Sequence, residues 1–388
     1  MTREIAISET YLPTYYMGAG IKGFNIVDVA KKMISNAESV TLDTSYLKED
    51  FRANSYTQTP FKEIINMNIE DKIPGSRLGL LDSVREYDLP FNEIVSKLKE
   101  ALKGYIVKCW DSNSPKLFLH SAGYDSRIIS GIITELREER GSDWIGDIHF
   151  RCHQPEGELF KQIMEAEGWD NSQYSLWEDM KENEDHYNLG RIEPVNGFMS
   201  FTQQYDFFSD YTKDREKDII IIGGIYGGEL FDYLAGGKNH FKNFKYCDNV
   251  LLNSLHNYML CEGGTITKYF DDHKYAIFPF LSYDYLEAAT KMPTKYITRN
   301  PNLERSKPDN IREALLKSFD FDIYSIQYGR HDYHWNITND TWNKMSKFYQ
   351  SSKFYNDHKI DIDIPFKVKS YSDMMWTLSL MYDKIFNK

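Results

Sequence analysis

Apolar and polar residues recur along the chain with two periods, one typical of helices and one typical of strands. Over 26–37, 91–107 and 128–136 the apolar residues return every three to four positions. This spacing places them on one face of an amphipathic helix. Short apolar runs at 117–119 and 218–222 are typical of strands that are buried on both faces of a sheet. The pattern therefore predicts an α/β protein.

A second strand–turn–helix unit follows the first. Residues 147–153 alternate as a strand, 154–158 form a turn, and 159–168 form a helix that ends in glycine. Repeated units of this kind are typical of a doubly wound parallel sheet. Nearer the ends of the chain, we expect a strand over 40–47. Residues 372–386 predict an apolar-faced helix that docks on the core or at a subunit contact.

Length and composition narrow the class of protein. The 388 residues allow one large or two ordinary domains, and 41% hydrophobic with 27% charged residues is typical of a soluble globular chain. No apolar run approaches the ~20 residues that a membrane span needs. The four cysteines lack metal-binding spacing, and no secretory signal is evident at the N-terminus. We therefore expect a cytoplasmic protein with no membrane partner.

The charge balance bears on partners. A formal net charge of −12 argues against a broad nucleic-acid-binding face, which needs a basic surface. A local basic groove remains compatible with this average. An oligomer is compatible with the apolar face expected at 372–386.

The most informative stretch joins the strand expected at 117–119 to the helix expected at 128–136. It is short, polar and contains a glycine. The free N–H groups of a helix's first turn, with its dipole, form a ready anion site, and Gly123 allows close backbone approach to a phosphate. We expect Arg127 to add positive charge at the rim. The candidate nucleotide contacts in this loop are His120, Ser121, Ala122, Gly123, Tyr124, Asp125, Ser126 and Arg127.

Asp125 is the exception in this loop, because a carboxylate beside phosphates repels them unless a cation lies between. A Mg²⁺ ion held by Asp125 and phosphate oxygens removes the conflict. The local chemistry is equally consistent with a plain βα turn in which Asp125 caps the helix.

A glycine-rich segment, GGIYGGELF, follows the apolar run at 218–222. Four glycines after a buried parallel strand indicate a backbone that turns sharply or meets a ligand closely. Ligands bind at the carboxyl ends of strands in open α/β sheets, so this segment is a second candidate contact.

The motif S-A-G-Y-D-S at 121–126 resembles the S-G-G-x-D-S pyrophosphate loop of the asparagine synthetase-like N-type ATP pyrophosphatases, the PP-loop family. Ala122 replaces the second residue and is small enough to keep the turn. Weaker matches extend from Pro60 to about Arg330. The resemblance implies an adenine nucleotide alpha hydrolase-like, doubly wound parallel sheet, with a small α+β N-terminal region and a helical C-terminal tail.

The resemblance also implies roles for residues outside the loop. Gly223 and Gly224 match glycine-loop positions that contact the nucleotide, and Cys152 occupies the strand end whose backbone reads adenine. Glu229 matches the Glu of the family's E-L-F sequence. It is expected to act with Asp125 as a metal ligand and catalytic residue, and a structural cap on the next helix is the alternative for Glu229.

Three positions depart from the family's pattern. Ile225 stands where the family has Glu, Gly228 where it has a metal-binding Asp, and Tyr328 where it has a catalytic Lys. Arg330 is the nearest cation to Tyr328. It is expected to stabilise the charge of the phosphorus transition state, and an ordinary surface position is the alternative.

The implied function is that of an ATP-dependent carbon–nitrogen ligase. It would use ATP and Mg²⁺ to adenylate a carboxylate, release pyrophosphate and transfer the acyl group to ammonia or an amine. The implied domains are 1–90, an α+β region; 91–335, the ATP pyrophosphatase domain; and 336–388, a helical extension. The region 1–90 is either a shortened glutaminase-like remnant without its catalytic Cys or an unrelated α+β cap. Nitrogen would then come from free ammonia, a substrate amine or a separate ammonia-supplying partner.

The departures keep two alternatives open. One is a catalytically impaired nucleotide-binding partner or regulator. The other is a pyrophosphate-loop enzyme that modifies a nucleic-acid base, which the acidic charge balance disfavours.

Overall fold

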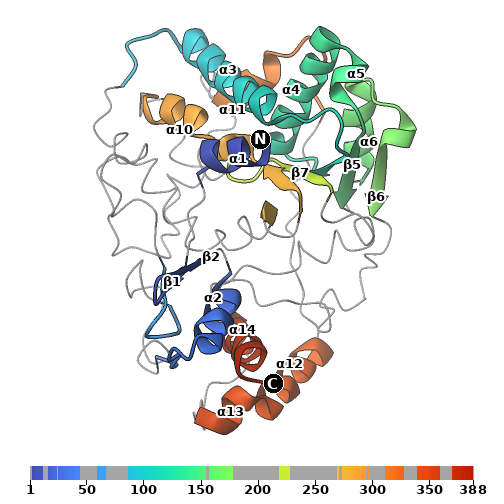
Figure 1. Ribbon diagram of the computed structural model, residues 1–388. Coiled ribbons are helices and arrows are strands. Elements are labelled where there is room, and N and C mark those ends of the chain that lie inside the picture. The colour runs from blue at the N-terminus through green and yellow to red at the C-terminus, as the bar shows by residue number, and fades with distance from the viewer. Residues whose placement is uncertain are drawn as a thin grey trace.

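A computed structural model describes the backbone of most of the chain (Figure 1). The described residues are 2–11, 16–23, 25–43, 59–66, 86–153, 157–177, 218–227, 269–270, 273–293, 296, 311–326, 339–358 and 369–387. The first part of the chain forms α1 (Thr2–Glu9), β1 (Tyr16–Gly18), β2 (Ile21–Gly23), α2 (Ile26–Ser35), β3 (Ile65–Asn66) and α3 (Phe91–Cys109).

The middle of the chain carries the strands of the large sheet. Its elements are β4 (Lys116–His120), α4 (Tyr124–Arg140), α5 (Ser142–Ile145), β5 (Ile148–His153), α6 (Gly157–Ala166), η3 (Asn171–Gln173), β6 (Tyr174–Trp177), β7 (Ile220–Gly223) and β8 (Tyr275–Ile277). The last part is helical, with η5 (Pro279–Leu281), α10 (Tyr283–Thr290), α11 (Ile311–Lys317), α12 (Asn339–Ser351), α13 (Lys353–His358) and α14 (Lys369–Phe386).

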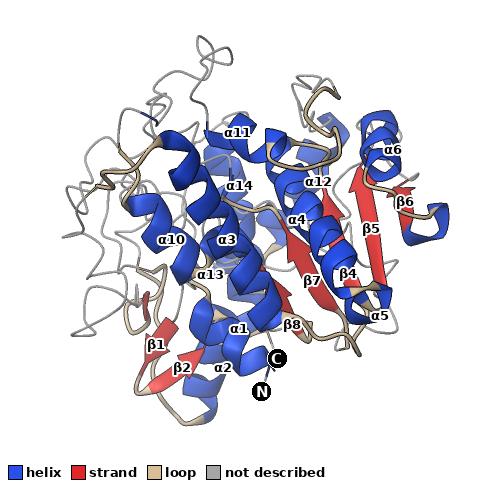
Figure 2. Ribbon diagram, turned by 90° about the horizontal axis from the view of Figure 1, so that it is seen from above, coloured by secondary structure: helices blue, strands red, loops and turns tan. Residues whose placement is uncertain are grey.

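Five strands form one parallel sheet in the order β6-β5-β4-β7-β8. The chain leaves β4 toward β5 and β6 on one side and later returns to β7 and β8 on the other. The strand order therefore reverses between β4 and β7, and helices flank the sheet (Figure 2). This confirms the predicted α/β fold with a parallel sheet. Every residue of β7 is buried, as its unbroken apolar run requires.

The helices predicted from 3.6-residue periodicity are present as α2, α3, α4, α6 and α14. In α3 the expected stripe of Ile94, Leu98, Leu102 and Ile106 is fully buried. It packs in the same core as the apolar face of α4. The elements that the pattern did not predict are mostly short, such as the three-residue strand β8 and the four-residue strand β6.

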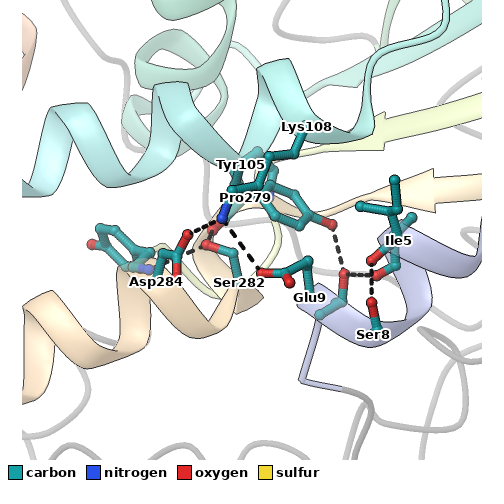
Figure 3. A network of polar contacts seen from close by, with 11 residues as sticks. Ile5, Ser8, Glu9, Tyr105, Lys108, Pro279, Ser282 and Asp284 are labelled. Atoms are coloured by element: carbon teal, nitrogen blue, oxygen red, sulfur yellow. Dashed lines mark hydrogen bonds and ion pairs between the residues drawn. The ribbon is translucent and has the colours of Figure 1, made fainter. Parts of the chain in front are cut away.

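Polar contacts join the N-terminal helix α1 to α3 and α10, which belong to the core around the sheet (Figure 3). Lys108 Nζ lies 2.6 Å from Asp284 Oδ2 and 3.6 Å from Glu9 Oε2, so it links α3 to α10 and to α1. The buried Thr10 hydroxyl donates to the Ala6 carbonyl and lies 2.6 Å from the Tyr105 hydroxyl. Because Thr10 donates its proton to Ala6, the Tyr105 hydroxyl is the donor in the second bond.

A second hydrophobic core lies apart from the sheet, at the lower end of Figure 1. It joins α2 and the three short antiparallel strands β2-β1-β3 to the C-terminal helices α13 and α14. The predicted docking of the C-terminal helix is thus onto α2. Of the strand expected over 40–47, the described residues 40–43 form only an isolated bridge between Leu42 and Phe61 rather than a strand. Residues 44–47 lie outside the described residues. Among the residues described, none of the helices has the length and apolarity to cross a bilayer.

The three implied domain boundaries stay a prediction. The second hydrophobic core does not follow the order of the chain, because it contains segments from near both ends of the sequence.

Candidate functional site

The candidate loop lies at the point where the strand order reverses. It follows β4, which pairs with β5 on one side and with β7 on the other. In the register of these pairs, His120 is opposite Cys152 and Leu119 is opposite Gly223. The ends of three strands therefore bring the predicted contacts to one edge of the sheet. Ligands of doubly wound folds bind at this edge.

The two serines of the loop hold its backbone. The hydroxyl oxygens of Ser121 and Ser126 are 3.0 Å apart, and Ser126 Oγ also accepts from the Ser121 backbone N–H at 3.2 Å. Ser121 is exposed, whereas Ser126 is buried. Ser121 is therefore the hydroxyl that an incoming anion would meet first.

The start of α4 tests the interpretation of Asp125 as a helix cap. The residue that precedes the helix is Gly123, which has no side chain. Asp125 is the second residue of the helix, so the interpretation of Asp125 as a helix cap is wrong. The positive end of the helix dipole lies at this turn and favours a negative charge nearby.

Asp125 is paired with a cation that comes from a distant part of the chain. Arg312 Nε in α11 lies 3.1 Å from Asp125 Oδ1, and both side chains are largely buried, with 13% and 25% exposed. Sequence reasoning missed Arg312, because the local sequence does not indicate which distant carboxylate an arginine will approach. Arg312 therefore supplies a positive charge beside Asp125, where the sequence had indicated that a cation is needed between the carboxylate and a phosphate.

The glycine loop after β7 lies directly against the start of α4. A Cβ atom at Gly224 would stand 2.9 Å from the carbonyl carbon of Asp125 and from the backbone nitrogen of Ser126. A Cβ at Gly227 would stand 2.8 Å from Asp125 Cγ. These contacts leave no room for a side chain, so they account for both glycines. They also bring the two predicted loops together.

Tyr285 of α10 is a further group near Asp125 that the sequence did not indicate. It is fully buried, and no residue that the structure describes forms a hydrogen bond with its hydroxyl. Burial raises the pKa of Tyr285 well above its usual value. The nearby charge of Asp125 and Tyr226 acts in the same direction, and Arg312 opposes it. Tyr285 is therefore a neutral hydroxyl beside the Asp125–Arg312 pair.

Arg127 is not at the rim, which corrects the sequence-based expectation. Its side chain is fully buried, and its guanidinium donates to three backbone carbonyls, those of Ala122, Ile323 and Ile326. A buried guanidinium with carbonyl partners is stable inside the fold. Local sequence gave no sign of this, because two of the carbonyls belong to the segment after α11.

The remaining candidates divide into buried and undescribed residues. His120, Ala122 and Cys152 are buried. The expected backbone role of Cys152 in reading adenine stays a prediction. Glu229 and Arg330 lie outside the described residues, as do Gly228 and Tyr328.

The predicted Mg²⁺ ion stays a prediction. Asp125 has Arg312 as its counter-charge in this structure. Glu229, the other expected metal ligand, lies outside the described residues. Within the described ranges, no cluster of three or more His, Cys, Asp or Glu side chains could hold a metal. A Mg²⁺ ion that arrives with a nucleotide needs only one or two protein carboxylates, because phosphate oxygens and waters complete its ligands.

Comparison with known proteins does not assign the chain to a family. No family model and no curated protein matches the chain.

Proposed function

We propose that the chain is an ATP-dependent carbon–nitrogen ligase that forms AMP and pyrophosphate. The observation that carries the proposal is the position of the α4 N-terminus, preceded by Gly123, at the strand-order reversal, with Arg312 paired to the loop carboxylate. Because Arg312 offsets the charge of Asp125, a triphosphate can approach the helix N-terminus without facing an uncompensated carboxylate. The motif at 121–126 supports ATP as the source of that triphosphate.

The reaction follows from the resemblance. A carboxylate oxygen of the substrate attacks the α-phosphorus of ATP, the bond from that phosphorus to the bridging oxygen breaks, and pyrophosphate leaves with the electron pair. An amine or ammonia then attacks the acyl carbon, and AMP leaves. The chain's part is to hold the departing pyrophosphate through the backbone N–H groups at the start of α4 and the exposed hydroxyl of Ser121.

The expected cofactors, ATP and Mg²⁺, belong to this proposal. Asp125 would hold the metal together with phosphate oxygens, and the metal would offset the negative charge of the triphosphate. Arg330 and Glu229 keep their implied roles only as part of the proposal. A cytoplasmic setting also belongs to it, since Cys109 and Cys152 are free thiols, which persist in a reducing compartment.

A second candidate function is nucleotide binding without turnover. It is favoured by Ile225, an apolar residue at the position where the resembled family has an acidic side chain. Such a protein would act as a partner or regulator, and it would bind ATP at the same loop.

The test is pyrophosphate release from ATP in the presence of a panel of small carboxylates and amines. We expect release that depends on one carboxylate and one nitrogen donor. Asp125→Ala should lower the rate at least ~100-fold, because the resemblance gives this carboxylate the Mg²⁺ ion that accompanies the triphosphate. Asp143→Asn, an exposed carboxylate just beyond the far end of α4, is the matched control and should keep the native rate.

The outcomes separate the candidates. ATP binding with no release in any mixture would favour the second function. An unchanged rate in Asp125→Ala would remove the Asp125–Arg312 pair from the site. Absence of ATP binding would contradict both functions.

A further inference from the structure

Ala122 has a backbone conformation that is uncommon for a residue with a side chain. Its φ angle is 53°, in the left-handed region where the Cβ atom of an L-residue crowds the following carbonyl oxygen. Glycine adopts this region without strain, and the resembled pyrophosphate loop has glycine at this position. A loop with alanine here needs neighbouring groups that hold the strained conformation.

His120 holds the amide side of Ala122. The Ala122 backbone N–H donates to His120 Nδ1 at 3.0 Å, so this ring nitrogen must be unprotonated. The imidazole is fully buried, and burial, followed by the charge of Arg127, lowers the pKa of His120 well below its usual value. The ring is therefore neutral, with its proton on Nε2.

The other ring nitrogen is held by a buried chain of polar side chains. His120 Nε2 lies 3.2 Å from Ser130 Oγ, which in turn lies 2.6 Å from Glu167 Oε1. Since Nε2 carries the proton, Ser130 Oγ accepts from it. The rings of Phe118 and Phe160 pack against the imidazole at centroid distances of 5.3 and 5.2 Å. These contacts fix the orientation in which Nδ1 faces Ala122.

Arg127 holds the carbonyl side of the same residue. Its Nε donates to the Ala122 carbonyl at 2.8 Å, and its Nη1 donates to the Ile323 and Ile326 carbonyls at 3.0 and 2.7 Å. The segment after α11 thereby anchors the guanidinium. Ala122 is gripped at both its N–H and its C=O by buried side chains that come from opposite ends of the loop.

We propose that His120 and Arg127 are positioning residues that hold Ala122 in its left-handed conformation, so that the loop between β4 and α4 is preformed for an anion. The inference rests on the proposed function for the identity of the anion, the triphosphate of ATP. The two side chains were expected to contact the nucleotide directly, and the positioning role takes the place of that contact. A preformed loop binds more tightly because less ordering remains to be done on binding.

The test is a double-mutant cycle. It combines a change of the hydrogen-bond acceptor at position 120 with a change of backbone freedom at position 122. His120→Leu removes the acceptor and keeps an apolar side chain among the aromatic rings. His120→Asn restores an acceptor, since asparagine readily accepts from the N–H two residues ahead. Ala122→Gly removes the need for support, because glycine adopts positive φ freely. The full-length variants are compared by ATP affinity and by hydrogen exchange of the residue-122 amide without nucleotide.

We expect His120→Leu to weaken ATP binding about tenfold, the equivalent of losing support for one left-handed residue. It should also speed exchange of the Ala122 amide by at least ~tenfold. His120→Asn should stay within about threefold of the native affinity. In the double variant H120L/A122G, ATP affinity should return to within about twofold of Ala122→Gly alone.

The outcomes overturn the inference in distinct ways. If Ala122→Gly fails to rescue His120→Leu, the histidine acts on the ligand itself and the proposed role is wrong. An Ala122 amide that stays protected in His120→Leu would also overturn it, and this holds even if that variant binds ATP poorly. If no variant and not even the native chain binds ATP while the exchange results hold, the proposed function alone has failed.

Discussion

At the scale of single residues, the glycine loop after β7 can approach the start of α4 because Gly224 has no side chain. Gly224 follows β7 and lies against the backbone of Asp125 and Ser126, at a distance that no Cβ atom tolerates. The neighbouring atoms are backbone rather than flexible side-chain ends. A methyl group at Gly224 would therefore have to displace the first turn of α4 or the strand end.

We predict that Gly224→Ala lowers the free energy of unfolding by about 1–3 kcal/mol, the usual cost of overpacking. Gly104→Ala is the matched control. Gly104 lies within α3, and a Cβ there would meet no atom within 4 Å. The same substitution should therefore raise the free energy of unfolding by about 0.5–1 kcal/mol, because alanine is the better helix former. Urea unfolding measures both, and equal stability of the two variants would contradict the contact.

The residue scale also marks the limit of prediction from sequence. The strand–loop–helix around Ser121 follows from local pattern, since Phe118 and Ile132 take buried positions that their spacing predicts. The cation beside Asp125 does not, because Arg312 reaches it only through the packing of α11 on α4. The burial of Arg127 escaped prediction for the same reason. The charge of an arginine alone indicates an exposed side chain, and two of the three carbonyls that Arg127 contacts are distant in sequence.

At the scale of elements, α4 is joined to the turn after α6 by a buried carboxyl group. Glu167 accepts from Ser130 Oγ at 2.6 Å, and Trp169 Nε1 donates to Glu167 Oε2 and to Thr134 Oγ1, each at 3.0 Å. Burial raises the pKa of Glu167 from 4.5 to about 8, against the opposing effect of these hydrogen bonds and of Arg137. The carboxyl group is therefore protonated in the folded protein at neutral pH.

This shift predicts a dependence of stability on pH. The folded state keeps a proton on Glu167 that the unfolded state releases above pH 4.5. The contribution to stability is thus fully present below pH 4.5 and is lost as pH rises through about 8. Relative to Glu167→Gln, the native free energy of unfolding should fall by up to ~1.4 kcal/mol for each pH unit in this window and then level off.

The measurement is urea unfolding of the native protein and Glu167→Gln at several pH values between 5 and 9. Glu165→Gln, an exposed position on α6, gives the background for losing a surface carboxylate. Parallel curves for the native protein and Glu167→Gln across the whole range would show that Glu167 is ionised in the fold.

At the scale of the whole molecule, the two hydrophobic cores use the chain in different ways. The core around the sheet is built mostly from the middle of the chain, with α1 added to it. The second core combines α2 and β1 with α13 and α14, whose residues lie far away in the sequence. A sequence pattern predicts that each helix has an apolar face, but it does not say which distant face covers it. The pairing of α2 with α14 was accordingly found only in the structure.

Separate cores predict separate responses to the same substitution. Leu378 in α14 and Leu102 in α3 are both buried, one in each core. Replacing either leucine with alanine should cost about 2–4 kcal/mol through lost contacts and a cavity. Because the second core contains fewer buried side chains among the described residues, Leu378→Ala should open it locally while the sheet stays folded.

Hydrogen exchange monitored along the chain measures where each variant opens. In Leu378→Ala, we expect faster exchange in α2 and α14 together, with native protection retained in α4 and β4. In Leu102→Ala, the faster exchange should instead include α3 and α4. The joint response of α2 and α14 is the decisive signal, since it requires the two ends of the chain to share one core. Loss of protection in α14 alone, or in both cores at once after Leu378→Ala, would contradict this organisation.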